Sequence, residues 1–168
     1  LIDYIYHRYV FDFQEMTQFP KELRQWLSDN CIISLPTLIT ESISPDGKTR
    51  KILLEMTDQS RVEAVLMEQH YGYSVCVSSQ VGCAMGCVFC ASTQGGLYRD
   101  LTVAEILGQV VIFGALTKEQ IHSVVVMGAG EPLQNYDNVL QALQLLHEPV
   151  ICNISYRKMT ISTCGWVP

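Results

Sequence analysis

One short segment, Ile121 to Met127, constrains the possible folds more than any other part of the chain. It is nearly all apolar and rich in β-branched residues, as expected for a strand covered on both faces of a parallel sheet. A capping box at Thr102 to Glu105 predicts a helix before this strand. After it, Asp137 is expected to cap a second helix, and Lys158 to Ser162 supplies another strand. Together with a strand expected over 71–79 before the first helix, these elements form a βαβαβ pattern, which predicts an α/β fold whose ligands bind at the carboxyl ends of the strands.

The first half of the chain has a different pattern. Two short helices are expected, over residues 1–10 and from Pro20 onward, and Leu23, Trp26 and Leu27 share one face of the second. Short strands are then expected over residues 31–40, 50–55, 61–67 and 71–79. The segment 1–57 is therefore predicted to be a small helical and β-rich accessory domain, with a second domain over 58–168.

Composition excludes several classes of protein. Hydrophobic residues make up 48% of the 168 residues, which excludes global disorder. No apolar run is long enough to span a bilayer, and the first ten residues do not resemble a signal peptide, so a cytoplasmic location and an origin in a longer chain are expected. The net charge of -6 has the wrong sign for unspecific attachment to nucleic acid.

The cysteines carry the clearest chemical signal. Three of the chain's 7 cysteines, Cys83, Cys87 and Cys90, form a C-x3-C-x2-C motif in a glycine-containing segment. Thiolates select zinc, copper(I) or iron-sulfur clusters, and a structural zinc site closes with a fourth ligand from a second pair. No such pair follows in the sequence. Three ligands without a fourth suit a 4Fe-4S cluster with one iron open, while zinc stays as the alternative.

Sequence context extends this interpretation to a family. Phe89 precedes the last cysteine, and a Gly-Glu-Pro turn follows the apolar strand. Together these features resemble the radical S-adenosylmethionine (SAM) superfamily. The stretches 71–83, 91–96, 127–137 and 161–168 narrow the resemblance to the RlmN/Cfr family of RNA adenine methyltransferases, and the Gly-Glu-Pro-Leu-Gln-Asn-Tyr turn looks more like the RlmN branch.

The resemblance implies a fold and a set of ligands. The chain would be the N-terminal half of a partial (β/α) TIM barrel preceded by the accessory domain. Cys83, Cys87 and Cys90 would hold the 4Fe-4S cluster. The SAM contacts would be, in chain order, Phe89, Gly130, Glu131 and Ser162. A core aromatic is the alternative for Phe89.

The resemblance also implies catalytic residues. In this family one SAM methylates a cysteine near the C-terminus, a radical made from a second SAM activates that methyl, and the carbon adds to C2 of adenine. Cys76 would resolve the protein-RNA adduct through a disulfide with the acceptor cysteine, and Glu63 would accept a proton. A small buried strand residue is the alternative for Cys76, and a solvated carboxylate is the alternative for Glu63. Cys31, Cys152 and Cys164 are expected to be packing residues.

The family's partners would be 23S rRNA, tRNA and an electron donor such as flavodoxin. The full-length enzyme would be a monomer and would not bind a membrane. The acceptor cysteine is absent from this sequence, so the chain by itself is expected to be inactive and prone to self-association. Two other classes stay open: a radical SAM protein with a different substrate, and a noncatalytic zinc or RNA-binding module.

Overall fold

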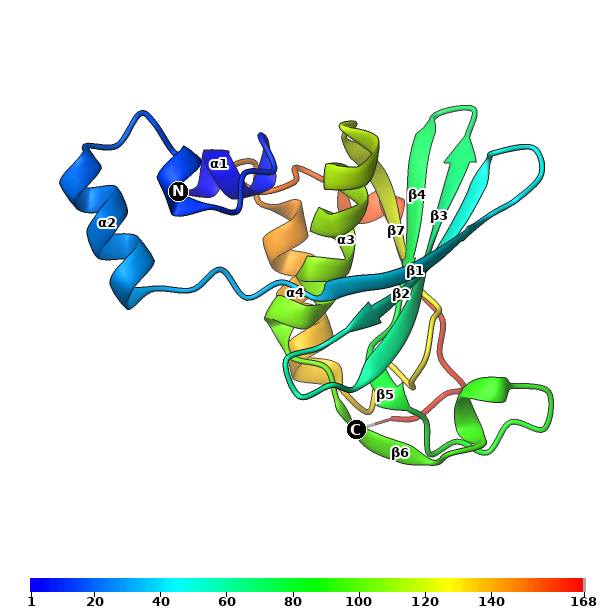
Figure 1. Cartoon of the computed structure of the whole chain (residues 1–168). Coiled ribbons are helices and arrows are strands. Elements are labelled where there is room, and N and C mark those ends of the chain that lie inside the picture. The colour runs from blue at the N-terminus through cyan, green and yellow to red at the C-terminus, as the bar shows by residue number, and fades with distance from the viewer. Residues whose placement is uncertain (168) are drawn as a thin grey trace.

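The computed structural model describes residues 1–167, in which a curled sheet carries helices on one side (Figure 1). The helices are α1 (Ile2–Tyr6), α2 (Lys21–Asn30), α3 (Val103–Thr117) and α4 (Tyr136–His147). The strands are β1 (Thr37–Ile43), β2 (Thr49–Glu55), β3 (Arg61–Gln69), β4 (Gly72–Val77), β5 (Gln80–Gly82), β6 (Leu97–Asp100), β7 (Ile121–Val126) and β8 (Met159–Ile161). Three 3-10 turns, η1 (Phe13–Glu15), η2 (Ala91–Thr93) and η3 (Tyr156–Lys158), lie between them.

Six strands form one sheet in the order β1-β2-β3-β4-β7-β8. The first four pair antiparallel, whereas β7 pairs parallel with both β4 and β8. The unit β4-α3-β7-α4-β8 confirms the alternation of strands and helices expected from the sequence. Strands β5 and β6 form a separate antiparallel pair that carries the cysteine loop.

Local sequence explains where the two long helices begin. The Thr102 hydroxyl accepts a hydrogen bond from the backbone N–H of Glu105, and the Glu105 carboxylate accepts one from the backbone N–H of Thr102, which completes the predicted capping box. Asn135, not Asp137, occupies the N-cap of α4, so the predicted cap is two residues too late. Asp137 lies in the first turn instead, where its charge favours the helix dipole.

The main core lies between the sheet and helices α3 and α4. Its fully buried members include Ile52, Leu54, Val75, Val124 and Phe113. Four of the six residues of strand β7 are buried, and His122 and Val125 are half-buried. Burial on both faces is therefore confirmed except at these two residues, of which Val125 pairs with Cys76 of β4 in the sheet register.

The N-terminal segment has its own small core of Tyr4, Phe13, Met16 and Leu27. Helix α2 stands apart from α3 and α4 (Figure 1), so Trp26 stays 56% exposed although it was expected to share the buried face with Leu27. The strand expected over 31–40 begins only at Thr37, because residues 31–36 form an extended connection without strand pairing.

The sheet is continuous across residues 57 and 58, where the sequence predicts a domain boundary. Strand β2 pairs with β3 along its whole length, and residues 56–60 form the turn between them. Among the described residues, no helix is long and apolar enough to cross a membrane.

Candidate active site

A loop between β5 and β6 carries the three cysteines of the motif. Gly82 has a φ of +76°, and a Cβ at this position would lie 2.0 Å from the carbonyl oxygen of Gly96. The backbone N–H of Cys83 donates to that same carbonyl at 3.0 Å, so the two ends of the loop meet closely. Glycine at position 82 is therefore required by both conformation and space.

All three cysteines of the motif line one cavity of about 250 Å³. Cys83 is buried, whereas Cys87 and Cys90 are half-buried. The other lining residues are Met85, Phe89, Ser92, Thr93, Met127, Gly128, Gly130, Glu131, Ser162, Thr163 and Cys164. Every residue that the resemblance assigned to the cluster or to SAM thus faces this single cavity.

The donor set of this cavity is made of thiols, the ligands that iron-sulfur clusters take. Within the described residues 1–167, no group of three or more His, Cys, Asp or Glu side chains is arranged to hold one metal ion. In an iron-sulfur cluster each thiolate binds a different iron, and the three cysteines of the motif can each supply one thiolate to such a cluster.

The turn after β7 forms the opposite wall of this cavity. Gly130 has a φ of +105°, and a Cβ there would lie 2.6 Å from the Cβ of Gln80 and 2.7 Å from the Oγ of Ser79. Any larger residue at position 130 would push the turn away from the start of the cysteine loop. The glycine in the Gly-Glu-Pro motif therefore brings the two segments into contact.

Glu131 is buried, with 3% of its surface exposed, and its carboxylate is occupied by hydrogen bonds. Its Oε1 accepts from the Thr163 hydroxyl at 2.6 Å and from the Leu133 N–H at 3.0 Å, and its Oε2 accepts from the Cys164 N–H at 2.8 Å. Burial acts to raise the pKa of Glu131, but these hydrogen bonds outweigh it and hold the pKa below its usual value. An ionised Glu131 thus ties the segment after β8 to the glycine turn.

Phe89 and Ser162 face the cavity from two different segments. Phe89 is 90% exposed, which rules out the alternative of a core aromatic. Ser162 follows β8, and its backbone N–H donates to the Val126 carbonyl at 3.1 Å. Both side chains are therefore free to contact a ligand in the cavity.

A second cavity of about 420 Å³ adjoins the first. Glu63 and Cys76 line it together with Leu53, Arg61 and Val65. Four residues line both cavities: Cys90, Ser92, Met127 and Gly128. The two cavities therefore meet where the last cysteine of the motif lies beside the end of β7.

The sheet register places Glu63 and Cys76 on the same face. Cys76 lies opposite Val65 on β3, and Glu63 is two residues from Val65, so the two side chains are diagonal neighbours. Cys76 is half-buried, and this burial raises the pKa of its thiol. Its position on the cavity face argues against the alternative of a buried packing residue.

Glu63 is exposed on the cavity wall and paired with a lysine. Its side chain is 58% exposed, and its Oε1 lies 2.9 Å from the Nζ of Lys51 on β2. Sequence reasoning missed Lys51, although the antiparallel strands β2 and β3 carry Lys51 and Glu63 on one face. It also missed Met127, the residue directly after the apolar strand, which lines both cavities.

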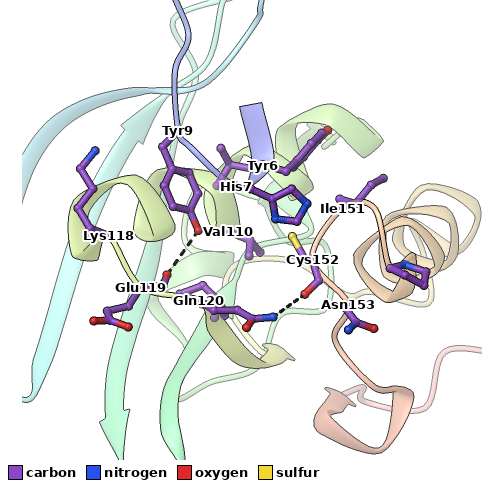
Figure 2. Close-up of a pocket in the computed structure, with 13 residues that line it drawn as sticks. Tyr6, His7, Tyr9, Val110, Lys118, Glu119, Gln120, Ile151, Cys152 and Asn153 are labelled. Carbon is purple, nitrogen blue, oxygen red and sulfur yellow. Dashed lines mark hydrogen bonds between the residues drawn. The ribbon is translucent and has the colours of Figure 1, made fainter. Parts of the chain in front are cut away.

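The other cysteines lie in three different places. Cys31 is exposed after α2, and Cys164 is exposed at the cluster-side cavity, so both were wrongly expected to be packing residues. Cys152 is half-buried as expected, and burial raises the pKa of its thiol to about 12. Cys152 lines a cavity of about 320 Å³ together with Ile121, which lies at the opposite end of β7 from Met127. Figure 2 shows Cys152 close to His7 in this cavity. All seven cysteines are free.

Two protein-family models match the chain. The Radical SAM superfamily matches residues 77–168, and the N-terminal domain of the ribosomal RNA large subunit methyltransferase matches residues 1–33. The first match contains the cysteine loop, the glycine turn and the segment after β8.

Relatives of known name match the whole chain. It is 48% identical over 168 residues to a probable dual-specificity RNA methyltransferase RlmN of Clostridium perfringens, and 49% identical over 170 residues to that of Symbiobacterium thermophilum. These alignments cover all of this chain but 48% and 46% of the relatives. The chain thus spans about half the length of the curated relatives it matches.

A solved structure supports the same fold. The crystal structure of a radical SAM methyltransferase from Sphaerobacter thermophilus superposes with a TM-score of 0.91 at 38% identity. The match covers 99% of this chain and 50% of that one. The curled sheet and the cysteine loop thus occur together in an experimentally determined structure of similar sequence.

Proposed function

The chain belongs to the radical SAM superfamily, and from this premise we propose that it carries the cluster-binding and SAM-binding part of an RNA adenine-C2 methyltransferase. The observation that carries the proposal is the pair of adjoining cavities. One holds the three cysteines of the motif with the predicted SAM contacts, and the other holds Glu63 and Cys76. The names of the relatives support RNA as the substrate class.

Each wall of the first cavity has a role in this proposal. Cys83, Cys87 and Cys90 would hold a 4Fe-4S cluster, which when bound would supply the electron for the cleavage of SAM. Phe89 offers an exposed ring on which an adenine can stack, and Gly130 leaves space at the turn for the methionine part of SAM. The depressed pKa of Glu131 keeps a negative charge on the same wall, which favours a protonated amino group nearby.

The chemistry of adenine explains why a radical enzyme is needed. C2 of adenine lies between two ring nitrogens and is electron-poor, so it cannot attack the methyl group of SAM as a nucleophile. A base placed in the second cavity would meet Glu63 and Cys76, and this cavity adjoins the SAM-binding cavity at Cys90 and Met127. A carbon radical formed in the first cavity can reach the base across this junction.

Cys76 and Glu63 complete the reaction in this scheme. As a thiolate, Cys76 attacks the sulfur of the acceptor cysteine that the family carries elsewhere in its sequence. A disulfide forms and the bond between that sulfur and the methylene carbon on the base breaks. The electron pair of the broken bond stays on the methylene carbon, which takes up a proton and becomes the methyl group of the product. Because the pKa of Cys76 is raised, its proton needs an acceptor, and Glu63 is a carboxylate on the same cavity wall.

The remaining parts of the proposal concern the whole protein. The RNA substrates are 23S rRNA and tRNA, the electron donor is a flavodoxin-like protein, and the enzyme works as a monomer in the cytoplasm. Residues 1–57 serve as the accessory domain and 58–168 as the first part of the catalytic domain.

A chimera tests the proposed function. Residues 1–168 replace the matching part of the Clostridium perfringens relative, and 2-methyladenosine is measured in RNA after anaerobic incubation with SAM and reductant. We expect product from the chimera, a covalent protein-RNA species with Cys76→Ala, and a loss of about 100-fold or more with Glu63→Gln. Glu68→Gln, on the same strand but outside both cavities, is the matched control. Normal turnover by Cys76→Ala without an adduct on a denaturing gel would contradict the assigned role.

A further inference from the structure

A buried glutamine next to the cysteine loop has no role in the function proposed above. Gln80 opens β5 three residues before Cys83 and is completely buried. A buried carboxamide is unfavourable unless its donors and acceptor are paired. The partners that it finds therefore show what its position contributes.

The carboxamide of Gln80 joins three segments of the candidate site. Its Oε1 accepts the backbone N–H of Glu131 at 2.8 Å, in the glycine turn. Its Nε2 donates to Asp100 Oδ1 at 2.7 Å, at the end of β6, and to Gln134 Oε1 at 3.3 Å. One side chain thus connects the entry to the cysteine loop, the strand that leaves the loop, and the turn on the opposite wall.

The backbone and the aliphatic part of Gln80 strengthen the same connection. The N–H groups of Ser79 and Gln80 both donate to the Ala129 carbonyl, at 2.8 and 3.1 Å. A Cβ on Gly130 would overlap the Cβ of Gln80, so the glycine turn already lies directly against this side chain. The distance between the two cavity walls is therefore set at Gln80.

The connection continues beyond the glycine turn. Glu131, whose N–H bonds to Gln80, holds Thr163 and Cys164 through its carboxylate. A chain of hydrogen bonds therefore runs from the cysteine loop through Gln80 and Glu131 to the segment that contains Ser162. These segments carry the three cysteines and all of the predicted SAM contacts, including Phe89, which lies on the cysteine loop.

We propose that Gln80 is a positioning residue that fixes the glycine turn against the cysteine loop and thereby sets the affinity for SAM. The SAM-binding part of this inference rests on the proposed function, whereas the structural part does not. Gln80 acts through Glu131 and Asp100, and the structure gives it no place on either cavity wall.

A second buried glutamine offers a matched control. Gln109 on α3 is also completely buried, and its carboxamide bonds the N–H and the carbonyl of Ser78 at 2.8 and 3.0 Å. It contacts the chain directly before Gln80 but bonds neither the glycine turn nor β6. Gln80→Leu and Gln109→Leu therefore each remove buried carboxamide hydrogen bonds, and only the first loses bonds made directly to the glycine turn and to β6.

Hydrogen exchange tests the structural part in the chain without any cluster. In Gln80→Leu the amides of Glu131 and Cys164 should exchange about tenfold faster than in the wild type, because a buried hydrogen bond that holds their segment is lost. In Gln109→Leu these amides should keep their wild-type rates. Unchanged exchange in Gln80→Leu, or equal acceleration in both variants, would overturn the proposal.

SAM affinity tests the consequence in the reconstituted chain. Gln80→Leu should keep the iron content of the wild type and bind SAM about tenfold more weakly, whereas Gln109→Leu should stay within about twofold of wild type. Faster exchange combined with wild-type SAM affinity would make Gln80 a purely structural residue and overturn its role at the site. A wild-type chain that takes up no iron would instead refute the proposed function.

A pair of substitutions that exchanges the carboxamide and the carboxylate covers the case in which Gln80→Leu fails to fold. Gln80→Glu keeps an acceptor for the Glu131 N–H but places a carboxylate against that of Asp100, so the wall should loosen and SAM affinity should fall. Adding Asp100→Asn restores a donor and an acceptor between the two side chains, and SAM affinity should recover. Failure of Asp100→Asn to rescue Gln80→Glu would contradict the proposal.

Discussion

At the residue scale, the site depends on a position where no side chain is allowed. Gly130 combines a φ of +105° with contact against Gln80 and Ser79. Gly47, in the turn between β1 and β2, has a φ of +74° but no heavy atom within 4 Å of a Cβ built on it. The two glycines share the conformational requirement and differ in the space around them.

Gly130→Ala should therefore cost much more than Gly47→Ala. We expect the free energy of unfolding to fall by about 1 kcal/mol for Gly47→Ala, from the left-handed conformation alone. For Gly130→Ala we expect a loss of about 2–5 kcal/mol, because overlap with Gln80 adds to the strain. Urea unfolding of both variants measures the difference, and equal losses would show that the turn moves aside without cost.

Residue-scale prediction from sequence succeeds where the information is local. The C-x3-C-x2-C spacing and the Gly-Glu-Pro turn identify residues that line one cavity in the structure. The bonds from Glu131 to Thr163 and Cys164 join residues more than thirty positions apart, so no spacing rule reveals them. The exposure of Cys164 was missed for the same reason, because it follows from the packing of β8 beside β7.

At the element scale, Arg99 on β6 holds three elements together at the base of the cysteine loop. Its guanidinium bonds Asp58 Oδ2 at 2.7 Å, both carboxylate oxygens of Glu105 at 2.8 and 2.9 Å, and Ser60 Oγ at 3.0 Å. The hydrogen bond from Arg99 holds the pKa of Asp58 well below its usual value. Burial opposes ionisation of Glu105, but the bonds from Arg99 and Thr102 outweigh it and lower its pKa.

Arg99→Met should lower the melting temperature in a pH-dependent way. At pH 7 we expect a loss of about 3–6 °C, because a bidentate ion pair is removed. The folded-state pKa values of Asp58 and Glu105 are depressed. The two carboxylates therefore stabilise the folded state fully above their unfolded-state pKa values, at about pH 4, and this stabilisation is lost as the pH falls further. The difference in melting temperature between wild type and variant should shrink as the pH falls from about 4 to about 2, and a difference as large at that lower pH as at pH 7 would contradict this explanation.

Elements were predicted well where a pattern had a specific start signal. The capping box located α3, and the β-branched run located β7. Helix α2 formed as predicted, but its spacing pattern could not show that it has little to pack against, so Trp26 is exposed. The N-cap of α4 was misassigned because Asn135 and Asp137 are both good capping residues, and the buried bonds of Asn135 to Ser79 and Leu101 decide between them.

At the scale of the whole molecule, one sheet joins the N-terminal strands to the catalytic ones. Sequence patterns distinguished an antiparallel part from a βαβαβ part, yet they could not show that β4 belongs to both. Strand β1 forms one edge of this sheet, and all of its residues are exposed, including Ile39 and Ile43. Such an edge offers unpaired backbone groups to a second chain.

The chain should therefore self-associate through β1. We expect Ile39→Lys to weaken self-association by about tenfold, because a charge on the edge opposes strand pairing. Leu23→Lys, at an exposed position on α2, is the control that adds the same charge away from the sheet. Sedimentation equilibrium measures both, and an equal effect of the two substitutions would point to net charge instead of the strand edge.

The iron content of the anaerobically reconstituted chain shows whether the three cysteines of the motif bind a cluster. The account predicts about four irons per chain, lost on replacing any one of Cys83, Cys87 and Cys90 by alanine and kept in Cys76→Ala. Cys76 is the matched control because it lies on β4, outside the cluster-side cavity. A colourless chain that holds one zinc, or a Cys76→Ala variant that loses its iron, would contradict the account.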